Sequence, residues 1–399
     1  MKAEPSVSVA AASRVRILHW AQVAVSEAVP GEAGYPDSMF DYASRVSRLQ
    51  ALMSDHSIDT VLLTAGSDMS YFSGYTAMPL ERITAFVVGR DGDPTLFVPA
   101  LEAPRVETGD FEVAPWGETD DPIGLVMKRL SSSSRVAIGD TMWSSFLLDF
   151  QNRTDDVEWS VASELTRELR MRKESGELDR LRRAAEATDR VLARIPAEVK
   201  FAGRAESDVA ADFARMVVEE GHDRSWFTII ASGPDSASPH HETGGRIIEQ
   251  GDMVVCDFGG TIDGYCSDVT RTLVVGGPKE KQLDVHALVK AANEAGRAAI
   301  APGVSCQEID RAARQVIEDG GYGRYFIHRT GHGIGLEGHE HPYIVEGNAL
   351  PLEAGMTFSV EPGVYIPGEF GVRVEDIVAC GADAVDDLNQ ADRSLVEVG

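Results

Sequence analysis

The chain has 399 residues, of which 37 are Lys or Arg and 64 are Asp or Glu, so its formal net charge at pH 7 is −27. Nucleic acids and anionic membranes both require a concentrated positive field, and this charge argues against either as a main partner. A hydrophobic fraction of 43% is ordinary for a globular protein. The length predicts two or three domains, because single hydrophobic cores stop growing at about 250 to 300 residues.

The cysteines and the N-terminus indicate the compartment. Four cysteines lie far apart without a C-x-x-C pair: Cys256, Cys266, Cys306 and Cys380. This pattern favours a reducing compartment over a disulfide framework, and no stretch approaches the ~18 apolar residues of a membrane helix. The first residues make a poor signal peptide, because His19, Gln22 and Ser26 interrupt the apolar run. We therefore predict a soluble, cytoplasmic protein in which residues 1–38 are a dispensable extension.

Hydrophobic periodicity predicts a mixed α/β domain over residues 39–170. Apolar residues at helical spacing predict a helix over 42–55, and short apolar runs bounded by Gly, Asp and Pro predict strands. The expected strands cover residues 60–63, 85–88, 95–98 and 136–139. A segment dense in Arg, Glu, Leu and Ala, from about Ser163 to Ile195, predicts one or two linking helices with Pro196 as a late breaker.

The second predicted domain, residues 171–399, contains most of the histidines. Helices are expected over 206–220, 280–300 and 306–319, alternating with hairpin-like strand pairs. Eight of the ten histidines follow residue 221, and four of them lie within fourteen residues: His328, His332, His339 and His341. The chemistry is therefore expected in this domain.

The first hairpin of that domain presents two aspartates. An apolar strand leads into Asp257, Asp263-Gly264 is a turn signal, and a second strand runs through Asp268 to Val275. Paired residues in a hairpin have a constant index sum. The sum is 525 for the two aspartates and 527 for the turn, so the aspartates should lie nearly opposite each other. Like charges so placed destabilise a sheet unless a cation lies between them. The alternative is that one aspartate is an exposed turn residue.

A second hairpin repeats this arrangement with glutamates. Glu361 and Glu375 interrupt strand-like runs and are centred on Gly368, where Pro367-Gly368 supplies the reversal. A salt bridge to Arg373 or Arg271 would explain either glutamate alone. Four carboxylates presented at matched positions favour a metal centre instead.

The segment between the hairpins, residues 328–342, combines glycines with histidines. Glycines let the backbone approach a site closely, and imidazoles supply a neutral ligand and proton carriers. Gly333 to Gly338 matches the dinucleotide fingerprint G-x-G-x-x-G, but Pro342 and the histidines argue against the helix that this motif must open. Four carboxylates and an imidazole exceed a single zinc site. They favour a pair of Mn²⁺, Co²⁺ or Zn²⁺ ions. Such a pair can share a hydroxide between the two ions, which is suited to hydrolysis.

These motifs also carry a family resemblance. Asp257, Asp268 in Ser-Asp-Val-Thr-Arg-Thr, His332 in Gly-His-Gly-Ile-Gly-Leu, Glu361 in Val-Glu-Pro-Gly-Val-Tyr and Glu375 in Val-Arg-Val-Glu-Asp follow one another as in the pita-bread metallopeptidases. The chain most resembles their proline-specific branch, prolidase (Xaa-Pro dipeptidase) and aminopeptidase P, over roughly residues 170 to 380. The resemblance implies an α/β (α+β) fold with a creatinase-like N-terminal domain, which Ser70 to Tyr75 resembles, and a pita-bread domain with a dinuclear metal site.

The resemblance also implies roles for the site residues. The five residues would bind two divalent ions, usually Mn²⁺, with two carboxylates bridging. Four further residues would serve the substrate or a ligand: His240 would bind the substrate or stabilise the tetrahedral intermediate, His339 would contact the scissile carbonyl, His328 would help to shape the pocket and Arg373 would orient the ligand glutamate. Glu361 or Glu375 could relay a proton to the leaving amine. A homodimer is expected from the family alone.

One departure from the family concerns the substrate. Prolidases often carry an arginine after His-Glu-x-Pro that binds the free carboxylate of the dipeptide, and Tyr343 occupies this position in the substrate pocket here. Hydrolysis of Xaa-Pro dipeptides is the leading hypothesis, and aminopeptidase P activity on longer Xaa-Pro-Yaa peptides is the alternative. A small-amide hydrolase, a lyase and a non-catalytic binding module remain open, although the intact ligand set argues against the last.

Overall fold

The computed structural model describes residues 40–107, 109–130 and 134–399. The predicted extension, residues 1–38, lies outside the described residues. Among the described helices, none is both long enough and apolar enough to cross a membrane.

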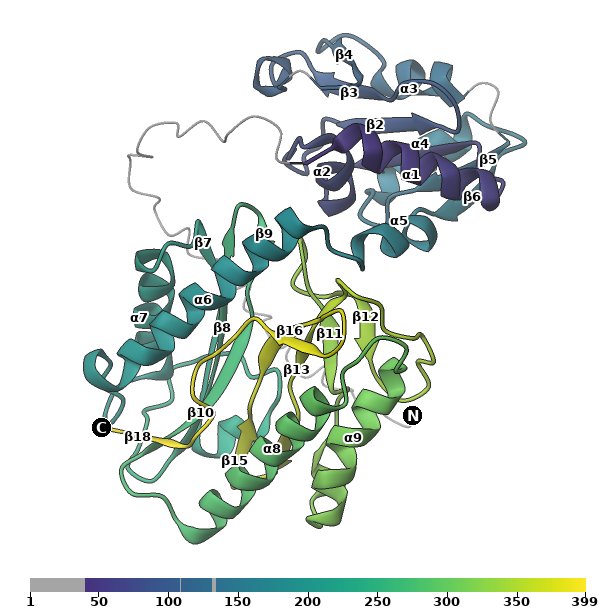
Figure 1. The fold of residues 1–399 in the computed structure, drawn as a ribbon. Helices are drawn as coiled ribbons and strands as arrows, with labels where there is room; N and C mark the ends of the chain where they lie inside the picture. The colour runs from purple at the N-terminus through teal and green to yellow at the C-terminus, as the bar shows by residue number, and fades with distance from the viewer. Residues whose placement is uncertain (1–39, 108, 131–133) are drawn as a thin grey trace, which may run out of the picture. The chain divides into compact units, whose positions relative to one another are not determined.

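A six-stranded mixed sheet forms the centre of the N-terminal domain (Figure 1). Its strands are β1 (Thr60–Thr64), β2 (Ala85–Gly89), β3 (Thr95–Pro99), β4 (Glu112–Trp116), β5 (Arg135–Ile138) and β6 (Glu158–Val161), in the order β4-β3-β2-β1-β5-β6. The central strand β1 runs antiparallel to β2 and parallel to β5. All five residues of β1 are buried, which explains why its sequence is continuously apolar between two threonines.

Helices cover both faces of this sheet. They are α1 (Tyr42–Asp55), α2 (Ser67–Ser73), α3 (Pro122–Leu130) and α4 (Ser144–Asn152). Val61 and Leu63 pack with α1 and α2, whereas Leu62 points to the opposite face and packs with α3 and α4. The predicted helix 42–55 and the four predicted strands are confirmed, and β4, β6 and α2 to α4 were not predicted.

Two helices connect this domain to the rest of the chain. They are α5 (Ser163–Arg170) and α6 (Ser175–Glu198), which begins with a capping box between Glu174 and Glu177. The expectation that Pro196 breaks the second helix is wrong, because α6 continues past it and ends at Glu198. A proline in the last turn removes only one intrahelical hydrogen bond, and the buried face of α6 tolerates this loss.

The C-terminal domain contains two sheets and a separate hairpin. The first sheet holds β7 (Arg224–Ser232), β8 (Met253–Ile262), β9 (Tyr265–Cys266), β10 (Val269–Val275) and β18 (Val396–Val398). The second holds β11 (Gly331–Gly333), β12 (Glu340–Ile344), β13 (Thr357–Val360), β16 (Asp376–Cys380) and β17 (Val385–Asp387). The hairpin is β14 (Gly363–Ile366) with β15 (Phe370–Arg373). An isolated bridge from Thr270 to Glu375 joins the first sheet to the start of β16.

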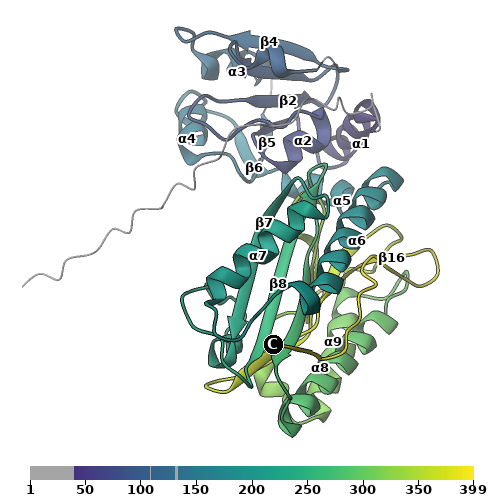
Figure 2. The same ribbon diagram turned by 90° about the vertical axis from the view of Figure 1, so that its left-hand side faces the viewer.

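Two helix pairs pack on these strands. The first pair is α6 with α7 (Glu206–Glu219), and the second is α8 (Glu280–Ala298) with α9 (Cys306–Asp319). Helices α8 and α9 lie side by side in both views (Figures 1 and 2). Apolar residues of α6 and α7 share one core with β7, β8 and β10. Residues of α8 share another core with β14 and β15. The strands that carry or flank the predicted ligands of the first hairpin therefore rest on a packed interior.

The register of each hairpin follows its turn. Asp263 (φ 51°) and Gly264 (φ 80°) form the first turn, and every pair from β8 to β9 and β10 has the index sum 527 that this turn predicts. In the second hairpin, Gly368 (φ 75°) lies in the turn and Gly363 faces Arg373. The same register continues from β13 to β16, so the centring on Gly368 is confirmed.

Candidate metal centre and active site

The four predicted acidic ligands meet where the sheets join. Ligand atoms of Asp257, Asp268 and Glu375 lie within 4.8 Å of one another, and so do those of His332, Glu361 and Glu375. Asp268 also lies within this distance of His332 and His339. Asp268, Glu375 and His332 thus belong to two groups each, which places them between the other residues of the cluster.

The hairpin registers explain how these side chains converge. Asp257 lies on β8 directly opposite Thr270, and Asp268 precedes Thr270 by two residues, so both aspartates point to the same face. The prediction that the two aspartates lie nearly opposite each other is confirmed, with the offset of two residues that separates the sums 525 and 527. Thr270 bridges to Glu375, and its Oγ1 donates to Glu375 Oε2 at 2.6 Å. Glu361 follows β13 directly.

His332 is held in the form that can ligate a metal. Its Nδ1 lies 3.1 Å from the Gly333 carbonyl oxygen, which can only accept, so Nδ1 carries the proton. The unprotonated Nε2 then points at the carboxylates, 3.4 Å from Glu361 Oε1 and 3.9 Å from Asp268 Oδ2. Burial, with the nearby His339, lowers the pKa of His332 to about 3. The imidazole is therefore neutral at physiological pH.

The buried carboxylates repel one another, and the positive side chains nearby do not compensate their negative charge. Burial and the neighbouring carboxylates raise the pKa of Asp268 and of Glu375 well above the usual range. Burial also raises the pKa of Glu361 to about 7, against the attraction of Arg373. Within the described residues, Asp257 Oδ1 and Asp268 Oδ1 are buried without a hydrogen-bond partner. Divalent cations would satisfy these oxygens and neutralise the cluster, so the residues fit a metal site.

Arg373 is the buried guanidinium of the centre. It forms an ion pair with Asp257, its Nε donates to Thr270 Oγ1 at 3.0 Å, and it lies 3.9 Å from Glu375 Oε2. Its Nη1 donates to the Tyr365 hydroxyl at 3.1 Å. These contacts place Arg373 where it can orient both Asp257 and Glu375.

His328 is connected to Arg373 through Tyr365. The Nδ1 of His328 donates to the Arg329 carbonyl oxygen at 2.7 Å, so its Nε2 accepts from the Tyr365 hydroxyl at 2.9 Å. Tyr365 is buried and was not predicted, although it lies within the quoted motif Val-Glu-Pro-Gly-Val-Tyr. Its position in the same motif as the predicted ligand Glu361 is the only sequence signal for Tyr365.

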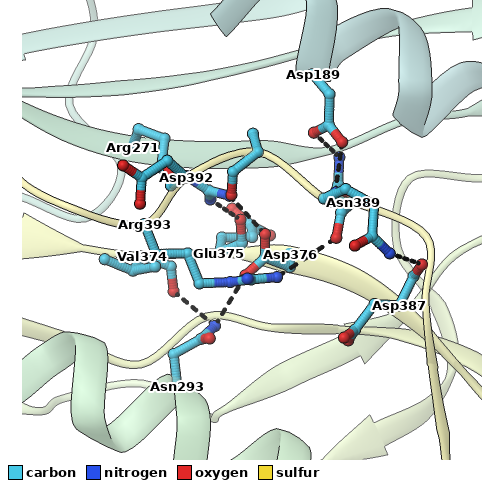
Figure 3. Close-up of polar contacts among 12 residues, drawn as sticks. Asp189, Arg271, Asn293, Val374, Glu375, Asp376, Asp387, Asn389, Asp392 and Arg393 are labelled. Atoms are coloured by element: carbon cyan, nitrogen blue, oxygen red, sulfur yellow. Dashed lines mark hydrogen bonds and ion pairs between the residues drawn. The ribbon is translucent and has the colours of Figure 1, made fainter. Parts of the chain in front are cut away.

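A second polar network lies directly behind Glu375 (Figure 3). Arg271 Nη1 donates to the Glu375 carbonyl oxygen at 2.7 Å, and Arg271 Nη2 donates to Asp376 Oδ1 at 2.7 Å. Asp376 Oδ2 accepts from Arg393 Nε at 2.6 Å and from Asn293 Nδ2 at 3.3 Å. The carboxylate partner of Arg271 is thus Asp376 and not a predicted ligand. Asp376 was missed because its partners are distant in sequence.

The predicted substrate residues lie around this centre. Tyr343 pairs with His332 across β11 and β12, and its ring lies under the Arg329 guanidinium, 4.2 Å from Cζ to the ring centroid. His339 is exposed, and its ring centroid lies 3.8 Å from that of His332. A cavity of about 170 Å³ opens beside His339 and Tyr343 and is also lined by residues of the N-terminal domain, among them Thr64 and Asp68. His240 is exposed.

His240 precedes a histidine that is firmly held. His241 Nε2 lies 2.8 Å from Oε2 of the buried Glu206, whose Oε1 accepts from the backbone and side chain of Ser232 at 2.7 Å each. Glu206, Asp235 and His241 group their ligand atoms within 4.8 Å. Because Glu206 is already fully hydrogen-bonded, this group anchors the segment that carries His240.

Comparison with known proteins assigns both halves of the chain. The model of metallopeptidase family M24 matches residues 179–382, and that of the creatinase/prolidase N-terminal domain matches residues 45–172. The chain belongs to metallopeptidase family M24. A probable dipeptidase PepE of Mycobacterium tuberculosis is 41% identical over 364 residues, covering 90% of this chain and 96% of the relative.

Two further M24 relatives are proline-specific by name. An Xaa-Pro dipeptidase of Pyrococcus furiosus is 34% identical over 354 residues, 88% of this chain and 99% of the relative. The crystal structure of a prolidase from Thermococcus sibiricus is 36% identical, with a TM-score of 0.86 over 90% of this chain and 100% of that one. The predicted fold, a creatinase-like domain followed by a pita-bread domain, is confirmed. The protein is an M24 peptidase, and its family implies divalent metal ions.

Proposed function

We propose that this peptidase hydrolyses the bond between the two residues of Xaa-Pro dipeptides. The observation that carries the proposal is the buried cluster of Asp257, Asp268, His332, Glu361 and Glu375, in which two carboxylate oxygens have no partner among the described residues. The names of the relatives from Pyrococcus furiosus and Thermococcus sibiricus support proline specificity. Aminopeptidase P activity on longer peptides is the second candidate, because Tyr343 stands where prolidases often carry the arginine that binds the dipeptide carboxylate.

Two divalent ions would be held by the five residues, with Mn²⁺ as the first choice and Co²⁺ or Zn²⁺ as substitutes. Asp268 and Glu375 are the proposed shared ligands, because they are the carboxylates that belong to two ligand groups each and a carboxylate offers two oxygens. The ions, when bound, would activate a water molecule as the nucleophile and polarise the scissile carbonyl. Arg373 keeps Asp257 and Glu375 in place through its ion pairs and its hydrogen bond to Thr270.

The remaining residues would act on the substrate. His339 and His240 would donate hydrogen bonds to the oxygen of the scissile carbonyl as its negative charge develops. His328 is neutral, because burial and the nearby Arg373 lower its pKa to about 4, and it shapes the pocket beside Tyr365. An Xaa-Pro bond releases a secondary amine that must be protonated, and Glu361 is the proposed proton carrier.

The domain organisation and the assembly belong to the same proposal. We place the boundary between the two domains at residues 170 and 171, where α5 ends, and the two family matches, which end at 172 and begin at 179, support this position. A cytoplasmic homodimer is the proposed form of the enzyme. Size-exclusion chromatography with light scattering would measure the assembly directly.

Substrate assays with Ala-Pro, Ala-Pro-Ala and Ala-Ala in the presence of Mn²⁺ test the function. We expect cleavage of Ala-Pro alone. Cleavage of Ala-Pro-Ala would favour the aminopeptidase, and cleavage of neither proline substrate would refute both candidates. Asp257→Asn and Glu361→Gln should each lose activity and bound metal, whereas Glu346→Gln, which removes an exposed partner of Arg311, should retain both.

A further inference from the structure

A chain of ion pairs links the N-terminal domain to the loop that carries His339. Arg170, the last residue of α5, donates from Nη1 to Asp68 Oδ1 at 2.7 Å, and Asp68 lies in the first turn of α2. Its other terminal nitrogen, Nη2, pairs with Glu340 at the start of β12. The side chains of Arg170, Asp68 and Glu340 are 11%, 15% and 7% exposed, so water and salt screen this chain far less than a surface ion pair.

The carboxylate at each end of this chain has a second partner. Asp68 Oδ2 accepts from Thr166 Oγ1 at 2.9 Å, so both oxygens of Asp68 are bound by α5. Glu340 Oε1 accepts from Nζ of the buried Lys173 at 2.5 Å. Arg170 therefore lies between two carboxylates that are themselves fixed.

Glu340 fixes the backbone of the loop formed by residues 333–341. A Cβ on Gly335 would lie 2.6 Å from Glu340 Oε1, so a larger residue at position 335 would collide with the carboxylate. Glu340 also pairs with Gly333, the residue after the predicted ligand His332, and it follows His339 directly. The carboxylate thus holds the loop between the two histidines.

His339 takes its position from this loop, because its own side chain is exposed. Its ring centroid lies 3.8 Å from that of His332, and a ligand atom of His339 lies within 4.8 Å of those of His332 and Asp268. A shift of the backbone at Glu340 would move the imidazole relative to this cluster. Misplacing a positioned group by about 1 Å can cost about 100-fold in rate.

We propose that Asp68 of the N-terminal domain is a positioning residue, which holds Arg170 against Glu340 and thereby sets the position of His339. This inference rests on the proposed function, in which His339 contacts the scissile carbonyl. Without the charge of Asp68, Arg170 would be drawn toward Glu337, whose Oε2 lies 3.3 Å from Nη2 and whose side chain is 38% exposed. Catalysis would then depend on a domain that supplies none of the proposed metal ligands.

Two measurements on the metal-loaded Asp68→Asn enzyme test this inference. Hydrogen–deuterium exchange with mass spectrometry should show amide exchange at least about 3-fold faster in peptides from residues 333–341. For the better of the substrates Ala-Pro and Ala-Pro-Ala, kcat should fall about 3- to 30-fold, with KM changed by less than about 2-fold and bound metal unchanged. Arg170→Gln should show both effects at least as strongly, and adding Asp68→Asn to it should change neither further, because the two residues act through one network.

Arg48→Gln is the matched control. Arg48, in α1, also pairs across the domain boundary, with Glu174 at the N-cap of α6. Among the described residues, neither of these two forms a hydrogen bond or an ion pair with the loop at residues 333–341. The control removes a contact between the domains and should leave both exchange in the loop and kcat unchanged.

Several outcomes would overturn the inference. Unchanged exchange in residues 333–341 of Asp68→Asn would do so whatever the substrate, and faster exchange with unchanged kcat would mean that the chain of ion pairs only stabilises the loop. A rise in KM alone would mean that Asp68, which lines the cavity beside His339, contacts the substrate. Equal effects in Arg48→Gln would mean that any loosening between the domains suffices.

The wild-type enzyme separates these failures from a failure of the proposed function. If it cleaves Ala-Pro or Ala-Pro-Ala, each of the results above overturns the inference and leaves the proposed function intact. If it cleaves neither, the proposed function fails, and the role assigned to Asp68 in catalysis fails with it.

Discussion

Asp376→Asn should strongly destabilise the catalytic domain, although Asp376 is not a proposed ligand. The side chain of Asp376 has 0% exposure and that of Arg271 has 4%, and they are joined at 2.7 Å (Figure 3). Arg393 pairs with the other carboxylate oxygen of Asp376 at 2.6 Å. The substitution keeps the shape but leaves two guanidinium groups without their counter-charge.

The magnitude follows from the burial of this pair. Removing one partner of a buried ion pair costs about 3 to 5 kcal/mol, and the amide oxygen of Asn can still accept one hydrogen bond, so we expect about 3 kcal/mol. For a domain of this size the loss corresponds to about 6 to 12 °C in Tm. Burial alone would raise the pKa of Asp376, but the charges of Arg271 and Arg393 hold this pKa below its usual value. The stabilisation is therefore present at neutral pH and is lost as the pH falls through that pKa.

Differential scanning calorimetry of the metal-loaded protein at pH 7 measures this effect. Glu346→Gln is the control, because its pair with Arg311 has side chains 57% and 54% exposed and should be worth at most about 1 kcal/mol. A loss in Asp376→Asn no larger than that of the control would refute the reasoning. Activity should fall as well, since Arg271 also holds the Glu375 carbonyl oxygen.

Three further predictions concern metal, pH and the segment that carries His240. Adding Mn²⁺ to chelator-treated protein should raise Tm, because ions that bind only the native state stabilise it; Asp268→Asn should abolish the shift, and an equal shift in this variant would contradict the ligand assignment. Burial lowers the pKa of His286 to about 4, so the unfolded chain gains a proton below pH 6.5 that the folded chain excludes. Stability should therefore drop by about 2 kcal/mol more between pH 8 and pH 5 in the wild type than in His286→Gln, as urea unfolding at both pH values would show. Glu206→Gln weakens the hold on His241 and should lower kcat severalfold with metal content unchanged; loss of metal would instead indicate a structural role.

The backbone of the site was largely predictable because tight turns set the strand register. The turn at Asp263-Gly264 and the centring on Gly368 both gave the observed index sums. The difference of two between the sum for Asp257 with Asp268 and the sum for the turn is the offset that the structure shows. The outer strands and helices of the first domain were missed, since β4 and β6 are only partly buried and lack a clear apolar run.

The side chains that orient the ligands were not predictable in the same way. Asp376 stands next to Glu375 in the sequence, but its partner Arg271 lies 105 residues away, and the pairing depends on how two sheets meet. Local patterns predict the positions of such residues, whereas their partners are a property of the fold.

Buried carboxylates in this chain fall into two kinds, and the distinction explains why burial alone does not identify a metal site. Both oxygens of Asp376 are matched by arginines, and both oxygens of Glu340 are matched by Lys173 and Arg170. The negative charges of these carboxylates are compensated by residues of the chain itself. Asp257 and Asp268 are equally buried, yet each keeps an oxygen without a partner among the described residues. Only carboxylates of this second kind require positive charge from outside the chain, and they lie where both hairpins and His332 converge.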